Sequence, residues 1–352
     1  MINYKLDRNP ILSHSYIDEE GVEVTTTILC IGDPHFGKRF TTGVPKHRLG
    51  EREVNMLAEF KRLIRYKADY IIIMGDLFDK FIVSPTVLYT VYEALSEITD
   101  TLIYIIPGNH DLSKDVTKTS SFTLFGKLVN STLENVKVIE VSDLVQVNDM
   151  LYLYLDAYSP FSNQSLVPYD VISTINNKQN GCEVVSFGHW DSMDLTSNGW
   201  MPSNELLSLS DLVVSGHEHS YKEYTYPTDK SKTKILFTGS MQPYSHAEDP
   251  DNNIYVTLKR DELSKYDLTK DFQYKCLRVL CDSYFVFDEV VDCYSLNCKI
   301  VLPDEVENSL SNDTELDVEN YINTMQLWIE ACDSIDVNFK QEVKTVLEDK
   351  TY

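Results

Sequence analysis

Glycine, cysteine and basic residues are scarce in this sequence of 352 residues. It contains 13 glycines and seven cysteines, and the cysteines are scattered without a C-x-x-C pair. This usage argues against a zinc finger or a disulfide framework and suits free thiols in a reducing cytosol. No apolar stretch approaches the length needed to cross a bilayer, and the first ten residues lack the pattern of a signal peptide. We therefore expect a cytoplasmic protein without a membrane segment.

Positive charge is also scarce. The sequence has 31 Lys and Arg against 55 Asp and Glu, and its formal net charge is −24. A domain that grips nucleic acid by charge alone is normally basic, so the simplest interpretation is a soluble acidic protein. If the ligand is nucleic acid, bound cations, local basic loops or a partner subunit must supply the positive field.

The first third of the chain alternates between apolar and amphipathic segments. Residues 25–31, 70–74 and 101–106 are apolar, β-branched runs that predict buried strands. Residues 51–67 and 85–98 carry one apolar face each and predict helices between those strands. This β-α-β-α-β order is typical of a parallel sheet covered by helices.

A second group of strands follows after about residue 136. Short strands are predicted close together between 136 and 155, as adjacent antiparallel strands would be. Further core strands are predicted at 183–187, 211–215, 234–238 and 253–258. Two sheets packed face to face with helices outside accommodate this order.

The length exceeds that of a usual single domain and leaves room for a smaller second unit. Residues 1–24 precede the core as either a peripheral strand or a disordered arm, and 25–260 form the main domain. After a mixed-charge linker at 259–271, residues 272–305 predict a small unit with strands. The tail, 313–352, predicts two helices whose apolar faces either pack on their own domain or dock a partner helix.

Five predicted strands end in a glycine followed at once by metal-binding side chains. One such turn is a weak signal, but five in order form a constellation. In open α/β folds, ligands bind at the carboxyl ends of the strands, so the turns can converge on one rim. They carry Asp33 and His35; Asp76 and Asp79; Asn109, His110 and Asp111; His189; and His217 and His219.

These side chains offer imidazole, carboxylate and amide oxygen, and no cysteine. Such a mixture suits manganese, iron or zinc at two linked positions better than a structural zinc. Seven of them are taken as ligands, which is too many for one ion and fits two ions that share a carboxylate: Asp33, His35, Asp76, Asn109, His189, His217 and His219. Two ions held in this way clamp a phosphate and activate a water for in-line attack.

In this order, the motifs D-x-H, GD-x-x-D, GNHD, GH and GHxH resemble those of the calcineurin-like metallophosphoesterases over roughly residues 25–258. The resemblance implies a four-layer α/β/β/α sandwich, followed here by a small C-terminal α+β unit ending in two helices. Narrower features resemble the SbcD branch of double-strand-break repair nucleases, and most of all its T-even phage members. They are DPHFGKRF, GDLFD, FGHW and the stretch at 237–256, FTGSMQPYSHAEDPDNNIYV.

The resemblance also implies a role for each residue. Two divalent ions, most readily Mn²⁺, would share Asp76 as the bridging ligand. His110 would face the scissile phosphate, and Asp111 would orient His110 through a hydrogen bond. Asp79 stands where some members carry a histidine tied to exonuclease activity, which leaves strand-end processing open. One ion would be held by Asp33, His35, Asp76 and His219, and the other by Asp76, Asn109, His189 and His217.

The function implied is that of a metal-dependent DNA endo/exonuclease in a recombination or repair complex. Its partners would be an SMC-like coiled-coil ATPase, docked on the C-terminal helices, and a second copy of the chain. The alternatives are a phosphatase or nucleotide phosphodiesterase of the same superfamily, which the extra C-terminal unit disfavours, and a non-catalytic scaffold, which the complete ligand set disfavours. A phage protein of this kind would act in the host-cell cytoplasm.

A basic cluster follows the first ligand turn. Its members are the best local candidates for contacts with a DNA backbone in an acidic chain. The alternative is a solvated loop. The candidates are Lys38, Arg39, Lys46 and Arg48.

Overall fold

The structure is a computed structural model. It describes residues 2–115, 117–178, 181–192, 200–227, 232–283, 287 and 290–301. The chain divides into two compact units, one made of 1–281 with 285–299 and the other of 282–284 with 300–352. The two tail helices predicted at 313–352 lie outside the described residues, and the domain boundaries expected from the sequence stay a prediction.

The first sheet has six strands in the order β1-β2-β3-β4-β5-β6. Its strands β3 to β6 are parallel, whereas β1 and β2 add to the β3 edge in antiparallel fashion. The strands are β1 (Ile2–Tyr4), β2 (Ile11–Ile17), β3 (Glu23–Ile31), β4 (Tyr70–Ile73), β5 (Leu102–Ile105) and β6 (Val136–Val138). The N-terminal residues therefore form peripheral strands, which settles the alternative between a strand and an arm.

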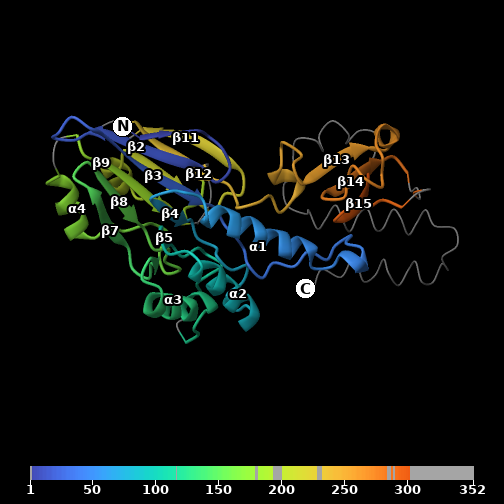
Figure 1. Cartoon of the computed structure of the whole chain (residues 1–352), viewed down its shortest axis with the longest axis horizontal. Helices are drawn as coiled ribbons and strands as arrows, with labels where there is room; N and C mark the ends of the chain where they lie inside the picture. Colours follow the sequence, from blue (N-terminus) through green and yellow to red (C-terminus); the bar gives the residue numbers. More distant parts are fainter. Residues whose placement is uncertain are drawn as a thin grey trace, which may run out of the picture. The chain divides into compact units, whose positions relative to one another are not determined.

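Three helices accompany the first sheet. They are α1 (Glu51–Ile64), α2 (Pro85–Ser96) and α3 (Ser121–Thr132), and a short 3-10 helix, η1 (Lys46–Arg48), precedes α1. Ser84 and Ser120 cap α2 and α3 by accepting hydrogen bonds from backbone N–H groups of the first turn. Helices α2 and α3 lie side by side (Figure 1).

The second sheet also has six strands, in the order β11-β12-β10-β9-β8-β7. Strands β12, β10, β9 and β8 are parallel, and β11 and β7 close the two edges in antiparallel fashion. The strands are β7 (Asp143–Asn148), β8 (Leu151–Leu155), β9 (Glu183–Gly188), β10 (Leu212–Ser215), β11 (Tyr221–Pro227) and β12 (Lys232–Thr238), and its helices are α4 (Tyr169–Asn176) and α5 (Asn204–Leu209).

Alternation along the strands builds three apolar layers. Cys30 and Ile72 of the first sheet share one buried cluster with Val185 of the second, so the sheets pack face to face. The neighbouring Ile31 and Ile73 point the other way, into a cluster with α1, α2 and α3. The outer face of the second sheet packs on α4 and α5. The predicted four-layer α/β/β/α sandwich is confirmed.

A third sheet follows the sandwich. It has the order β13-β14-β15, made of β13 (Tyr255–Lys259), β14 (Cys276–Cys281) and β15 (Ser295–Ile300). The 3-10 helices η2 (His246–Glu248) and η3 (Arg260–Lys265) flank β13. The expectation that residues 253–258 continue the core was wrong, because β13 pairs in parallel with β14 instead. Apolar alternation predicted the strand but carried no information about its partner.

No helix among the described residues is both long and apolar enough to span a bilayer.

Candidate metal centre

The five glycine turns do converge at the carboxyl ends of parallel strands. Asp33 and His35 follow β3, Asp76 follows β4, and Asn109 follows β5, all in the first sheet. The turns after β9 and β10 of the second sheet carry the remaining predicted ligands, His189, His217 and His219. Since the sheets pack face to face, the two sets of turns meet at one rim of the sandwich.

The glycines of these turns are needed mainly for space. At Gly75 the backbone φ is 96°, in the left-handed region that glycine favours. At Gly108 and Gly216, an added Cβ would overlap Asp76 and the Met74 carbonyl, respectively. An added Cβ at Gly75 would overlap His189 as well, so close approach of one turn to another applies at all three glycines, and the left-handed φ is a second requirement at Gly75.

Three of the predicted ligands have strained backbones. His35, Asp76 and His217 have φ values of 48°, 44° and 71°, where residues other than glycine are uncommon. Such strain costs on the order of 1–3 kcal/mol each and persists only where the surroundings impose it. Its concentration in three converging turns indicates that side-chain placement there is under functional constraint.

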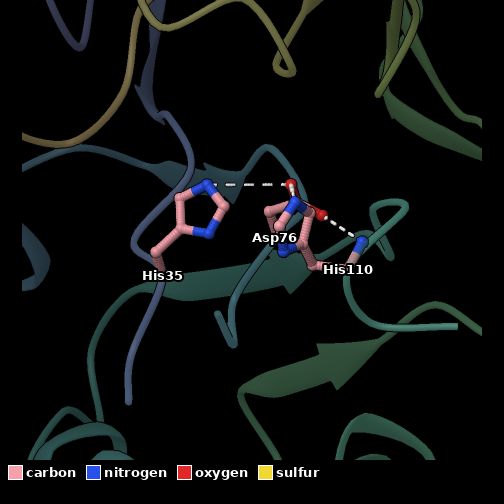
Figure 2. A group of neighbouring side chains, drawn as sticks. All are labelled: His35, Asp76 and His110. Atoms are coloured by element: carbon pink, nitrogen blue, oxygen red, sulfur yellow. Dashed lines mark hydrogen bonds and ion pairs between the residues drawn. The ribbon is translucent and has the colours of Figure 1, made fainter. Parts of the chain in front are cut away.

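The first cluster joins His35, His219 and Asp76. Nε2 of His35 lies 3.1 Å from Nε2 of His219 and 3.7 Å from Oδ2 of Asp76. Burial lowers the pKa of His35 to about 2, so its imidazole is neutral and has a lone pair to offer. Figure 2 shows the Asp76 carboxylate contacting the His35 ring on one side and the backbone N–H of His110 on the other.

The second cluster joins Asn109, His189 and His217. Oδ1 of Asn109 lies 2.9 Å from Nε2 of His189 and 3.0 Å from Nδ1 of His217. Oδ2 of Asp76 lies 3.5 Å from the same Nε2 of His189. Because this oxygen also contacts His35, Asp76 stands between the two clusters, as a bridging ligand would.

The hydrogen-bond chemistry of the second cluster calls for a cation. Nδ1 of His189 donates to the Met74 carbonyl at 2.8 Å, which leaves Nε2 as a lone pair. His217 directs its Nε2 at Asp191, so in the neutral ring Nδ1 carries the lone pair. Two ring lone pairs and the Asn109 carbonyl oxygen therefore point at one another, an arrangement that a bound cation stabilises.

The buried carboxylate of Asp33 also calls for a cation. It is fully buried, and neither oxygen makes a hydrogen bond of normal geometry within the described residues. Oδ1 has a 3.4 Å contact with Nδ1 of His189. Burial and the nearby Asp76 carboxylate raise the pKa of Asp33 well above its ordinary value. A divalent ion would satisfy these oxygens and reverse that cost, so the residues present fit a two-metal centre.

Asp76 is held in its charged form. Burial opposes the charge, but His189, His35 and His110 outweigh it and lower the pKa of the Asp76 carboxyl. The ionised carboxylate is the form that can ligate a metal.

Two acidic side chains outside the motifs orient the histidines. Asp191 holds His217, and although burial opposes it, this hydrogen bond raises the pKa of His217. Oε1 of Glu248 lies 3.3 Å from Nδ1 of His219 and leaves Nε2 directed at His35. Such carboxylate–histidine pairs fix the tautomer and ring direction of metal ligands. Sequence reasoning missed both, although Asp191 stands two residues after His189.

An arginine and an asparagine before β2 fasten the turns to one another. Nη1 of Arg8 donates to the carbonyls of His219 and Ser240 at 3.1 and 2.7 Å, and Nη2 donates to the Glu248 carbonyl at 2.6 Å. Asn9 accepts from the backbone N–H of Gly32 at 3.0 Å. Arg8 and Asn9 thus tie the turn after β3 to the loop carrying His219, a role that sequence reasoning did not give them.

His110 and Asp111 differ in what they do. His110 is 44% exposed, and its Nδ1 lies 2.6 Å from the carbonyl of Asp79. The expected hydrogen bond between the His110 ring and Asp111 is wrong, because both Asp111 oxygens accept backbone N–H groups, one from Phe78 and the other from Leu77 and Gly108. Asp111 therefore braces the Asp76 turn. Its carboxylate is satisfied by backbone donors that the sequence does not reveal.

A tight group of candidate metal-binding atoms nevertheless includes His110. Suitable atoms of His35, Asp76 and His110 lie within 4.8 Å of one another. Nε2 of His110 is 3.9 Å from Oδ2 of Asp76, the longest of the contacts that Asp76 makes with a histidine ring. Its exposure and its distance suit a group that faces a substrate.

Three of the four basic residues predicted to contact DNA are accessible to solvent, and the fourth is buried. Arg39 and Lys46 are exposed, and the partly exposed Lys38 lies 3.5 Å from Oδ1 of Asp79 beside the centre. Arg48 is buried, and its guanidinium bonds Glu51 and Asp292. Arg48 therefore joins the start of α1 to the segment before β15, and only Lys38, Arg39 and Lys46 remain candidates for DNA contact.

Comparison with known proteins assigns the sandwich to a protein family. Residues 26–221 match the family model described as calcineurin-like phosphoesterase. The chain belongs to this family. Membership makes it a metal-dependent phosphoester hydrolase and agrees with a centre built from histidine and aspartate.

Other similarities are distant. No curated protein matches the chain. The structure of TT1561 of Thermus thermophilus is similar at 14% sequence identity, covering 61% of this chain and 89% of that one, with a TM-score of 0.36. A hypothetical protein from Thermus thermophilus is similar at 16% identity, covering 60% of this chain and 75% of that one, with a TM-score of 0.31.

Proposed function

We propose that the chain is the nuclease subunit of a DNA recombination or repair complex and hydrolyses DNA phosphodiesters at a two-metal centre. The proposal narrows the family activity, phosphoester hydrolysis, to one substrate class. Within the family it places the chain in the SbcD branch, nearest to the T-even phage recombination endonuclease subunit, which has a similar length and the same GHW turn.

The observation that carries the proposal is the stretch at 237–256, which resembles the SbcD branch and lies beyond the family match. The hydroxyl of Tyr244 in this stretch lies 2.8 Å from the carbonyl oxygens of both Asp33 and Pro34, which share its one proton. Glu248 orients His219, and β13 begins at Tyr255. The stretch thus supports predicted ligands from both sheets and leads directly into the third sheet, an addition that hydrolysis of a small substrate does not require.

The residues of the centre divide the chemistry among them. When bound, two divalent ions, most readily Mn²⁺, supply Lewis acidity to the phosphate and lower the pKa of a water. Asp76, whose Oδ2 contacts both His35 and His189, would be the ligand that the two ions share. His110 donates Nδ1–H to the Asp79 carbonyl and would present Nε2 to the scissile phosphate. As an imidazolium it would stabilise charge there or give its Nε2 proton to the leaving oxygen and return to the neutral ring.

The net charge of −24 fits this division of labour. A polyanion approaching an acidic protein needs local positive charge, which two bound divalent ions and the candidates Lys38, Arg39 and Lys46 provide. An SMC-like coiled-coil ATPase and a second copy of the chain are the partners that we propose from the resemblance, with the ATPase docked on the C-terminal tail.

A nuclease assay tests the proposal. Linear duplex and hairpin DNA are incubated with the wild type and Asp76→Ala, in manganese, in magnesium and in chelator. We expect cutting that requires manganese and falls by at least about 10³-fold in Asp76→Ala, since one change removes a ligand from both ions. Asp149→Asn, at an exposed turn, is the matched control and should cut like the wild type.

The assay also separates the alternatives. A small chromogenic phosphodiester reports whether the centre works at all. Hydrolysis of that compound without DNA cutting, even after addition of a coiled-coil ATPase partner, would contradict the nuclease and favour a nucleotide phosphodiesterase. No hydrolysis of either substrate would leave only the scaffold.

A further inference from the structure

An apolar groove opens beside the metal centre, between α1 and α2. Its volume is about 680 Å³, within the range of small-molecule sites. Val54 and Leu57 of α1 form one wall, and Ile82 and Val87 form the other. Val54 is 67% exposed and Ile82 61%, so both walls present apolar surface to the solvent. A monomeric protein has no need of such a groove for its own packing.

The groove is joined to the centre by the ligand turns themselves. Its lining includes Phe36 to Arg39, directly after His35, and Lys80, directly after Asp79. Gly37 has a φ of 97°, and an added Cβ there would lie 2.9 Å from Cγ1 of Val83, so the turn is pressed against the second wall. The end of the groove nearest the ligands therefore has a fixed position relative to them.

Cations stand at that end. Nζ of Lys38 lies 3.5 Å from Oδ1 of Asp79, and the same oxygen lies 3.7 Å from Nδ1 of His35. Arg39 and Lys80 also line the groove. Glu53 partly offsets this charge, since its Oε1 lies 3.8 Å from Nε of Arg39. The groove is therefore apolar along its length and basic where it meets the centre. This combination matches a ligand with a flat apolar body and an anionic end.

We propose that this groove binds an unpaired nucleobase of the DNA strand being cut, with Lys38 and Lys80 contacting the adjacent phosphate. The inference rests on the proposed nuclease function and adds a substrate preference to it. A base within a duplex is stacked and paired, and bringing it into the groove carries an unstacking cost. The enzyme therefore favours ends and loops whose bases are already unpaired.

The test fills the groove with a side chain. Val54→Trp adds a large ring to the exposed face of α1 without changing the core, and Val141→Trp, at a site 77% exposed outside the groove, is the matched control. Each variant is assayed on duplex DNA with a single-stranded overhang and on blunt duplex. Each rate is normalised to the same variant's hydrolysis of a small chromogenic phosphodiester.

We expect the wild type to cut the overhang substrate at least about fivefold better than blunt DNA by kcat/KM, because unpaired bases avoid the unstacking cost. Val54→Trp should remove most of that preference, mainly by raising KM, and Val141→Trp should keep it. A 2-aminopurine in the overhang should change its fluorescence on binding to the wild type in chelator and not on binding to Val54→Trp.

Other results overturn the inference in recognisable ways. A wild type that cuts DNA with no preference for unpaired ends, or a Val54→Trp that keeps the preference, rejects the base site and leaves the nuclease intact. A change in oligomeric state on Val54→Trp, with the preference retained, assigns the groove to a protein contact. A wild type that hydrolyses only the small phosphodiester rejects the nuclease and the base site together.

Discussion

Nε2 of His35 lies 3.1 Å from Nε2 of His219, although the two residues follow strands of different sheets and are 184 positions apart in the sequence. Glu248 takes the other ring nitrogen of His219, and burial keeps His35 neutral. Two sheets have been brought together so that two ring nitrogens face each other. A cation held between them would explain why the two turns present these nitrogens to each other.

The first prediction concerns metal stoichiometry. The chelated wild type should take up two Mn²⁺ per chain, as counted by calorimetry and by the loss of the free-ion EPR signal. His35→Ala should remove one ion or weaken its binding by about 100-fold or more while the other remains, because His35 belongs to the first cluster only. His47→Ala, at an exposed site outside both clusters, should bind both ions. Loss of both ions in His35→Ala would mean that the clusters do not act as separate positions.

The second prediction is that Asp33→Asn changes the free energy of unfolding in opposite directions with and without metal. Asp33→Asn removes a carboxyl that is costly to ionise where it is buried and whose oxygens lack hydrogen-bond partners among the described residues, so in chelator it should raise the free energy of unfolding by about 1–3 kcal/mol. In saturating Mn²⁺ the order should reverse, since the wild type gains more binding energy. Urea unfolding in the two conditions measures both. A variant less stable than the wild type in chelator would show that Asp33 has a stabilising partner besides the metal.

The sequence predicted the fold and the place of the site for one reason. Apolar runs of strand length end abruptly at residues such as Gly75 and Gly108, and the polar side chains behind them are costly to bury without a partner. This signal is local, so one sequence suffices to find it. The strands at 25–31, 70–74 and 101–106 were placed to within one or two residues of β3, β4 and β5 at every end.

What the sequence could not show depends on distant contacts. Arg8 meets the carbonyl of His219 across 211 positions, and no motif announces an arginine that bonds backbone oxygens. Asp111 looks like a partner for its neighbour His110 but accepts backbone N–H groups of another turn. Arg48 looks like a surface cation but pairs with Asp292, 244 positions away. In each case the residue type indicated that a polar partner was needed, but the sequence did not indicate which residue that partner is.

The third prediction gives the N-terminal segment a measurable effect on the metal. Arg8→Ala should weaken Mn²⁺ binding about 10- to 100-fold, as loss of an outer-sphere contact does, because the loop carrying His219 loses its anchor. Arg8→Lys should recover part of the affinity. Arg62→Ala, which removes an exposed arginine paired with Glu59, should leave the affinity unchanged. Equal affinities of Arg8→Ala and the wild type, with the fold intact by circular dichroism, would contradict the anchoring role.

The fourth prediction concerns pH and a carboxyl away from the ligands. Asp156 is buried and accepts hydrogen bonds from Ser142, Tyr154 and Trp190, and burial raises its pKa to about 7. In the unfolded chain its pKa is roughly 4, so between these values the folded state holds a proton that the unfolded state has released. The free energy of unfolding should fall as pH rises from about 4 to about 7, by up to about 4 kcal/mol from this group, and then level off.

Asp156→Asn isolates that contribution, since the amide does not titrate. Urea unfolding in chelator at several pH values between about 5 and 8 should give a smaller decline for the variant than for the wild type. Asp149→Asn, at an exposed turn, should keep the wild-type decline. Parallel curves for Asp156→Asn and the wild type would show that Asp156 stays ionised in the folded protein throughout this range.

The last prediction distinguishes the role of His110 from that of Asp111, its neighbour in the GNHD motif. His110→Ala should lower kcat on a small phosphodiester by about 10²–10⁴-fold with both metals bound, because its half-exposed ring is free to face the substrate while Nδ1 holds the Asp79 carbonyl. Asp111→Ala should instead leave three buried N–H groups unpaired, lower the free energy of unfolding by several kcal/mol and weaken the metals. Kinetics, calorimetry and urea unfolding on both variants distinguish the roles. Metal loss in His110→Ala would make His110 a ligand, and a stable, metal-loaded Asp111→Ala would contradict its bracing of the turn.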